Sequence, residues 1–122
     1  MILADTSVWI DHLRTGDTEL ARLLGAGRIA CHDLVISELA LGSLRDRGQV
    51  LGLLDGLPRL PVAEAGELRA MIETRRLWGR GVGHVDCALL AACLLSPGTM
   101  LWTRDRRLRE VAAEAGIAHA AG

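Results

Sequence analysis

Apolar residues along this chain fall into short runs that alternate with longer stretches of helical spacing. The short runs predict buried strands at residues 2–4, 28–31, 60–62, 99–102 and 117–119. Apolar positions three or four residues apart predict helices over residues 7–14, 17–24, 33–44, 49–54, 63–78, 84–95 and 105–115. Strands that alternate with helices predict an α/β fold: a three-layer α/β/α sandwich around a short, mainly parallel central sheet.

Length and composition narrow the class of protein. A chain of 122 residues, half of them hydrophobic, is long enough for one compact domain, so we expect a single domain over residues 1–122. The net charge of -1 argues against a protein that binds a polyelectrolyte such as nucleic acid through its overall charge. All basic residues are Arg, which grips phosphate bidentately, but an Arg-rich composition can equally reflect a GC-rich genome.

Cysteine usage and hydropathy bear on the compartment. Cys31, Cys87 and Cys93 are odd in number, lack CxxC spacing and lie among apolar residues, which favours buried reduced thiols. No apolar stretch approaches the roughly 20 residues that span a bilayer. We therefore expect a cytoplasmic protein that does not enter membranes.

Two acidic residues follow predicted strands. Asp5 comes directly after the apolar run at residues 1–4, and Asp105 comes shortly after the run at residues 100–102. Ligands of parallel α/β sheets bind beyond the carboxyl ends of the strands. Both carboxylates are therefore predicted to lie at such a crevice, although Asp105 alone is also well placed to cap the last helix.

Two further acids lie within apolar helical surroundings. The residues three and four positions from Glu38 and from Asp86 are apolar or glycine. Glu73, by contrast, has Arg69 and Arg76 at those spacings, which is typical of a solvated surface acid. Glu38 and Asp86 are therefore predicted on apolar faces.

Carboxylates that converge on one end of the sheet need a positive charge to offset their repulsion. An all-oxygen set without Cys or His partners favours Mg²⁺ or Mn²⁺, which activate water and neutralise a phosphodiester. Thr6, Ser7 and Thr103 are placed to orient a carboxylate or a bound water, or serve as turn and cap residues. The pattern is typical of a nuclease.

These residues carry a resemblance to a known family. The chain resembles PIN-domain ribonucleases, and more narrowly the VapC toxins of bacterial toxin–antitoxin pairs, over nearly its whole length. The matching segments are Asp5-Thr6-Ser7-Val8-Trp9-Ile10, Ser37-Glu38-Leu39, His84-Val85-Asp86 and Trp102-Thr103-Arg104-Asp105.

The resemblance implies a PIN-like fold and Mg²⁺- or Mn²⁺-dependent cleavage of RNA, with Asp5, Glu38, Asp86 and Asp105 as catalytic and metal-binding residues. It also implies a homodimer and inhibition by a cognate VapB-like antitoxin. Many relatives have another acidic or Asn residue shortly after the fourth acid, where this chain has Arg106 and Arg107. The number of ions, one or two, stays open.

Two other functions compete with this interpretation. An aspartyl-phosphate phosphotransferase also places an Asp at a strand end, but residue 7 is Ser and the chain has no Lys for the phosphoryl group. A binding module that has lost catalysis is the second alternative, which the four intact acids argue against.

Surface residues suggest the contacts with partners. Arg75, Arg76, Arg80 and Arg104 are candidates for steering RNA, or form a solvated face, and Trp78 is a candidate for base stacking. The first helices carry more apolar residues than one small sheet can cover, which predicts that some of them line a groove for a partner. The resemblance implies that this partner is the antitoxin. The candidates for this groove are Val8, Ile10, Leu13, Leu20, Leu23, Leu24, Val50, Leu53 and Leu54.

Overall fold

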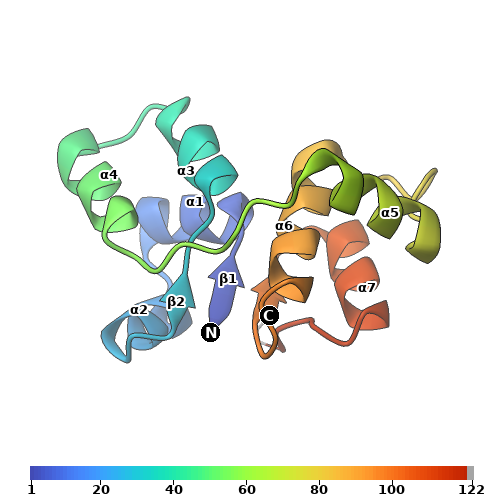
Figure 1. Ribbon diagram of the computed structural model, residues 1–122. Coiled ribbons are helices and arrows are strands. Elements are labelled where there is room, and N and C mark those ends of the chain that lie inside the picture. The colour runs from blue at the N-terminus through green and yellow to red at the C-terminus, as the bar shows by residue number, and fades with distance from the viewer. Residues whose placement is uncertain (121–122) are drawn as a thin grey trace.

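The computed structural model describes residues 1–120 and centres on a parallel sheet. Its strands are β1 (Ile2–Ala4), β2 (Ile29–Ala30) and β3 (Met100–Trp102), in the order β2-β1-β3. Ile2 of β1 pairs with Ile29 on one side and Met100 on the other. All strands run in one direction, so their carboxyl ends lie at one edge, away from the chain termini marked in Figure 1. The predicted α/β fold with a short parallel sheet is confirmed.

Helices lie on both sides of this sheet. Figure 1 shows α1–α4 grouped on the side of β2 and α5–α7 on the side of β3. Their bounds are α1 Thr6–Thr15, α2 Thr18–Gly25, α3 Asp33–Ala40, α4 Arg47–Asp55, α5 Ala65–Arg75, α6 His84–Leu94 and α7 Arg106–Glu114. The core between the layers is nearly all aliphatic, with Trp9 and Trp102 fully buried. None of the described helices is long and apolar enough to cross a membrane.

Two predicted strands are reduced to single bridges. In place of the strand predicted at 60–62, the structure has one isolated parallel bridge, between Arg59 and Cys31. Next to it, the Leu60 N–H donates to the Cys31 carbonyl at 2.9 Å. Pro61 has no N–H with which to extend the ladder. At 117–119, the pairing is a single bridge between Leu101 and Ala118. The predictions of full strands at these two places were wrong.

Several helix ends differ from their predicted positions for local reasons. The predicted helix 63–78 begins only at Ala65, because Glu64 and Glu67 form a capping box. It ends at Arg75, because Arg76 adopts the left-handed conformation with φ 54°. The helix predicted over 33–44 ends at Ala40, just before Gly42.

Candidate functional site

Asp5 is buried at the carboxyl end of β1 and caps α1. Its Oδ1 accepts hydrogen bonds from the Val8 N–H at 3.3 Å and from the Ser7 hydroxyl at 2.5 Å. The hydroxyl of Thr103, at the end of the neighbouring strand β3, donates to Oδ2. Because 98 residues separate Thr103 from Asp5, the parallel pairing of β1 with β3 is what brings this contact about. Ser7 and Thr103 thus fix the orientation of the Asp5 carboxylate.

Asp105 and Asp86 also lie at helix N-termini. Asp105 caps α7 by accepting the Leu108 N–H at 3.0 Å, and its own N–H donates to the Thr103 hydroxyl at 3.0 Å. Asp86, in the first turn of α6, accepts the Gly83 N–H at 3.1 Å. The partial positive charge of a helix N-terminus favours a carboxylate in each place.

Each of these last two carboxylates uses one oxygen for its helix. The bonds go to Oδ1 of Asp105 and Oδ2 of Asp86. Within residues 1–120, the other oxygen of each has no hydrogen-bond partner in the structure. The backbone therefore orients both side chains and leaves one oxygen of each available to a ligand.

Charge repulsion links the three acids. Burial raises the pKa of Asp86, and the negative charges of Asp105 and Asp5 raise it further, while the bond from Gly83 lowers it. None of the three forms an ion pair with a basic side chain in the part of the chain that the structure describes. Among residues 1–120, Asp86 therefore experiences the charges of other carboxylates without an ion-pair partner of its own.

Glu38 differs from its prediction. The residue is exposed on α3 rather than placed on an apolar face, because the buried face of this short helix is formed by Val35 and Leu39. Its Oε1 accepts a hydrogen bond from the Thr6 hydroxyl at 2.6 Å, which ties α3 to the start of α1. Thr6 directly follows Asp5, so Glu38 is tethered next to the end of β1.

A cavity of about 780 Å³ opens between α1, α3 and α4, and Glu38 lines it. Its wall is both apolar and charged, and is formed by Ile10, Leu13, Arg14, Thr15, Glu38, Leu39, Gly42, Ser43, Leu44, Arg45, Asp46 and Val50. Below, this cavity is called the α1–α4 groove.

Only part of the predicted groove lining is available to a partner. Ile10, Leu13 and Val50 line the α1–α4 groove as expected. Four of the candidates are instead core residues with at most 2% exposure and do not line the groove: Val8, Leu20, Leu23 and Leu54. The sheet and its helices cover more of the apolar side chains than the sequence suggested.

The donor set fits a hard divalent cation by its chemistry. Asp5, Asp86 and Asp105 offer only oxygen, at the edge where parallel sheets bind ligands, and two of them keep an oxygen without a hydrogen bond. Among residues 1–120, no three His, Cys, Asp or Glu side chains are already gathered closely enough to hold an ion. The residues present therefore suit Mg²⁺ or Mn²⁺ in type, without forming a preassembled cage.

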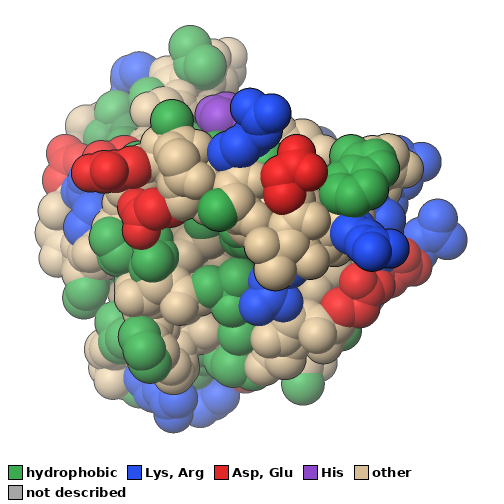
Figure 2. All heavy atoms as spheres, turned by 45° about the vertical axis from the view of Figure 1, so that its right-hand side comes forward, with side chains coloured by type: hydrophobic (Ala, Val, Ile, Leu, Met, Phe, Trp, Pro, Cys, Tyr) green, Lys and Arg blue, Asp and Glu red, His purple; other side chains and the backbone are tan. Residues whose placement is uncertain are grey.

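The arginines predicted to steer RNA divide into two groups. Arg104 pairs with Asp11, and Arg80 forms a bidentate pair with Glu114 at 2.9 and 2.6 Å. The positive charge of each arginine is therefore balanced by a neighbouring carboxylate. Arg75 and Arg76 are exposed. Figure 2 shows basic and acidic side chains interspersed on the face that it presents, which accords with the small net charge of the chain.

The sequence interpretation missed a network around Arg104. The guanidinium contacts Asp11 Oδ2 at 2.6 Å and also Asp17, the residue that caps α2. Nothing in the spacing of these residues along the chain predicts that they meet. The contacts form because the fold brings the turn between β3 and α7 next to α1 and the cap of α2.

Comparisons with known proteins show the family of this chain. The family model described as PIN domain matches residues 2–114. Ribonuclease VapC32 of Mycobacterium tuberculosis is 52% identical over 118 residues, which cover 97% of this chain and 95% of that protein. Ribonuclease VapC11 of the same species is 34% identical over 116 residues, covering 86% and 87%.

A solved structure supports the fold. The crystal structure of PAE2754 from Pyrobaculum aerophilum superposes with a TM-score of 0.65 at 18% identity, covering 90% of this chain and 83% of that one. At such low identity the likeness concerns the fold alone. With the family model and the close relatives, the site at the sheet edge leads to one assignment: this chain belongs to the PIN-domain family, among its VapC members.

Proposed function

We propose that this chain is an endoribonuclease dependent on Mg²⁺ or Mn²⁺, and the toxin of a type II toxin–antitoxin pair. The relatives at 52% and 34% identity are named ribonucleases, which supports the activity. The observation that carries the mechanism is the proximity of Asp86 to the charges of Asp5 and Asp105, without a basic partner among the described residues. RNA is the proposed substrate, and the three buried free thiols accord with action in the cytoplasm.

Asp5, Glu38, Asp86 and Asp105 would hold the ion. When bound, the ion supplies a water of lowered pKa and neutralises negative charge that develops on the phosphodiester. The Ser7 and Thr103 hydroxyls keep the Asp5 carboxylate in one orientation, and the Thr6 hydroxyl does the same for Glu38. The Asp5 and Glu38 carboxylates are thus already oriented before substrate arrives.

Asp86 is proposed as a ligand of the ion. Burial raises its pKa, and the negative charges of Asp105 and Asp5 raise it further. A bound cation would offset this repulsion and favour the ionised carboxylate. Its Oδ2 is held by the Gly83 N–H, which leaves Oδ1 available to the ion.

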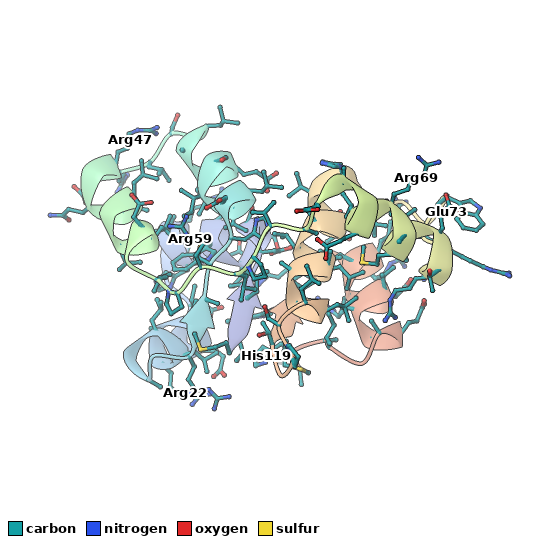
Figure 3. The ribbon with its side chains drawn as sticks, viewed as in Figure 1. Arg22, Arg47, Arg59, Arg69, Glu73 and His119 are labelled. Atoms are coloured by element: carbon teal, nitrogen blue, oxygen red, sulfur yellow. The ribbon has the colours of Figure 1, made fainter. Side chains whose placement is uncertain are left out.

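The nuclease proposal is tested with purified protein and RNA, with Mg²⁺ or Mn²⁺ and with EDTA. Cleavage is expected only with the metal, and Asp5→Asn or Asp86→Asn is expected to lower the rate at least about a hundredfold. Glu73→Gln is the matched control, because it removes one charge from a side chain that is 60% exposed at the outer end of α5 (Figure 3). Cleavage at full rate in EDTA, or an equal loss in Glu73→Gln, would contradict the proposal.

We propose the α1–α4 groove as the binding site of a VapB-like antitoxin. Ile10, Leu13 and Val50 supply apolar wall, and Glu38 brings the acidic site to the same cavity. An amphipathic helix with a basic side chain at one end fits such a groove, because the base can pair with the carboxylates. Inhibition would then combine apolar contact in the groove with charge neutralisation at Glu38. We also propose a homodimer, which the family resemblance supports.

A further inference from the structure

Arg104 connects the turn after β3 to two helices from the other half of the chain. Its Nη1 donates to Asp11 of α1 at 2.6 Å, and its Nη2 donates to Asp17, the cap of α2. The Asp17 Oδ1 meanwhile accepts the Leu20 N–H at 2.8 Å, so this carboxylate is fixed at both oxygens. One guanidinium therefore joins the turn after β3 to α1 and to the cap of α2, which lie 93 and 87 residues earlier in the chain.

The turn that Arg104 holds also carries contacts of the candidate active site. The Arg104 N–H donates to the Ser7 hydroxyl at 3.1 Å, and that hydroxyl donates to Asp5. Thr103, one residue earlier, donates to the other oxygen of Asp5, and the Asp105 N–H, one residue later, donates to Thr103. Residues 103–105 thus supply or support both hydroxyls that orient Asp5.

Among residues 1–120, no other hydrogen bond or ion pair joins this turn to α2 or its cap. The backbone bond to Ser7 and the Thr103 hydroxyl bond both end at the start of α1, whereas the guanidinium reaches across α1 to the cap of α2. Asp11 and Asp17 would repel each other without the positive charge between them. A planar fork with donors on both arms holds two carboxylates at a fixed spacing, whereas the three donors of a lysine ammonium share one nitrogen and have no fixed plane.

We infer that Arg104 is a positioning residue, which fixes the turn at 103–105 against α1 and α2 and so keeps the Ser7 and Thr103 hydroxyls on the Asp5 carboxylate. The effect on RNA cleavage rests on the proposed function, whereas the effect on the hydrogen bonds of the turn does not. Arg104 itself is not proposed to touch RNA or metal, because its two arms are occupied by Asp11 and Asp17.

The test measures amide hydrogen exchange by NMR in metal-free Arg104→Gln protein. The amides of residue 104 and of Asp105 donate to Ser7 and Thr103, so their exchange is expected to become about tenfold faster. The Leu101 amide, which donates to the Ile117 carbonyl within the core, is expected to be unchanged. Equal acceleration at Leu101 would mean general destabilisation and would overturn the inference, as would unchanged exchange at 104 and 105.

Matched variants separate positioning from charge. Arg22→Gln is the control, because Arg22 also forms a bidentate pair, with Glu19 at 3.1 and 2.6 Å, but on the outer surface of α2 (Figure 3). Arg104→Lys retains the charge and is expected to recover only part of the protection. Asp17→Asn keeps a capping side chain for α2 and removes one carboxylate from the network, so it tests the same link should Arg104→Gln fold poorly.

Kinetics then distinguish this inference from the proposed nuclease activity. If the wild-type protein cleaves RNA, Arg104→Gln is expected to lower kcat about tenfold to a hundredfold with little change in KM. If the wild-type protein cleaves no RNA, the proposed function fails, and the exchange measurement still decides the role of Arg104. A variant with faster exchange in the turn but wild-type kcat would overturn the link between the turn and the chemistry.

Discussion

At the scale of single residues, His32 shows how a buried polar group limits stability. The side chain is fully buried and caps α3, with Nδ1 accepting the Leu34 N–H at 3.0 Å. Its Nε2 has no hydrogen-bond partner among the residues that the structure describes. Burial lowers the pKa of His32, with Asp33 partly opposing the effect. The folded state therefore favours the neutral imidazole.

This predicts a loss of stability in acid that one substitution should reduce. The unfolded chain takes up a proton near the ordinary pKa of 6.5, whereas the folded chain resists it, so stability falls as pH drops from 6.5 towards the lowered pKa. The contribution is at most about 1.4 kcal/mol per pH unit. In His32→Asn, which keeps a capping side chain, the free energy of unfolding is expected to depend less on pH between 7 and 5.

Urea unfolding of both proteins at several pH values measures the effect. The difference in unfolding free energy between wild type and His32→Asn isolates His32, because other groups, including His119, titrate in both proteins. A difference that stays constant from pH 7 to pH 5 would show that His32 does not contribute in this way.

The positions of three candidate acids could be predicted from the sequence. Asp5 is buried and Asp86 half-buried, as their apolar surroundings indicated, and Asp105 follows β3 and caps α7, which its place after an apolar run suggested. Glu38 is exposed, because a helix of eight residues buries only a narrow stripe and Glu38 falls beside it. The partner hydroxyl of Thr103 was a candidate by its position, but its bond to Asp5 depends on the β1–β3 register.

At the scale of elements, local signals located helices better than weak strands. Every predicted helix is present, with ends moved by caps and left-handed residues such as Arg76. Strand pairing depends on distant partners, so the apolar run at 60–62 did not reveal that Pro61 would limit its pairing to one bridge. The network of Arg104 with Asp11 and Asp17 was missed for the same reason.

The exposure of the first helices alters which substitutions test the antitoxin groove. Leu20 is fully buried, so a charge there would unfold the domain rather than probe a partner. Ile10 is 41% exposed and lines the α1–α4 groove. Ile10→Glu is therefore expected to weaken binding of the antitoxin at least about tenfold while the protein stays folded.

Leu53 provides a matched control for that prediction. It is 49% exposed on α4 but is not among the residues that line the groove. Leu53→Glu should therefore leave the antitoxin affinity near that of wild type, with circular dichroism confirming the fold of both variants. Calorimetric titration with a cognate antitoxin would contradict the groove if Ile10→Glu bound as tightly as Leu53→Glu.

At the scale of the whole molecule, the candidate site joins the two ends of the chain. Asp5 caps α1, while Asp86 lies in the first turn of α6 and Asp105 caps α7. Figure 1 shows α1 with the helices on the β2 side, and α6 and α7 with those on the β3 side. An ion bound by these carboxylates would bridge both groups of helices in addition to the β1–β3 pairing. Metal binding and the stability of the folded chain should therefore be coupled.

This coupling predicts that Mn²⁺ raises the melting temperature. At a free concentration of a hundred times Kd, an ion that binds only the folded state stabilises it by about 2.7 kcal/mol, or roughly 10 °C for a chain of this size. Asp86→Asn should lose most of this rise. Without metal, the variant should melt no lower than wild type, because burial and its acidic neighbours already disfavour the ionised Asp86, as its raised pKa indicates.

Differential scanning calorimetry with and without Mn²⁺ measures both effects, with Glu73→Gln as the control that should respond as wild type does. An equal rise in wild type and Asp86→Asn would place the ion elsewhere, and a lower melting temperature for the metal-free variant would contradict repulsion among the carboxylates.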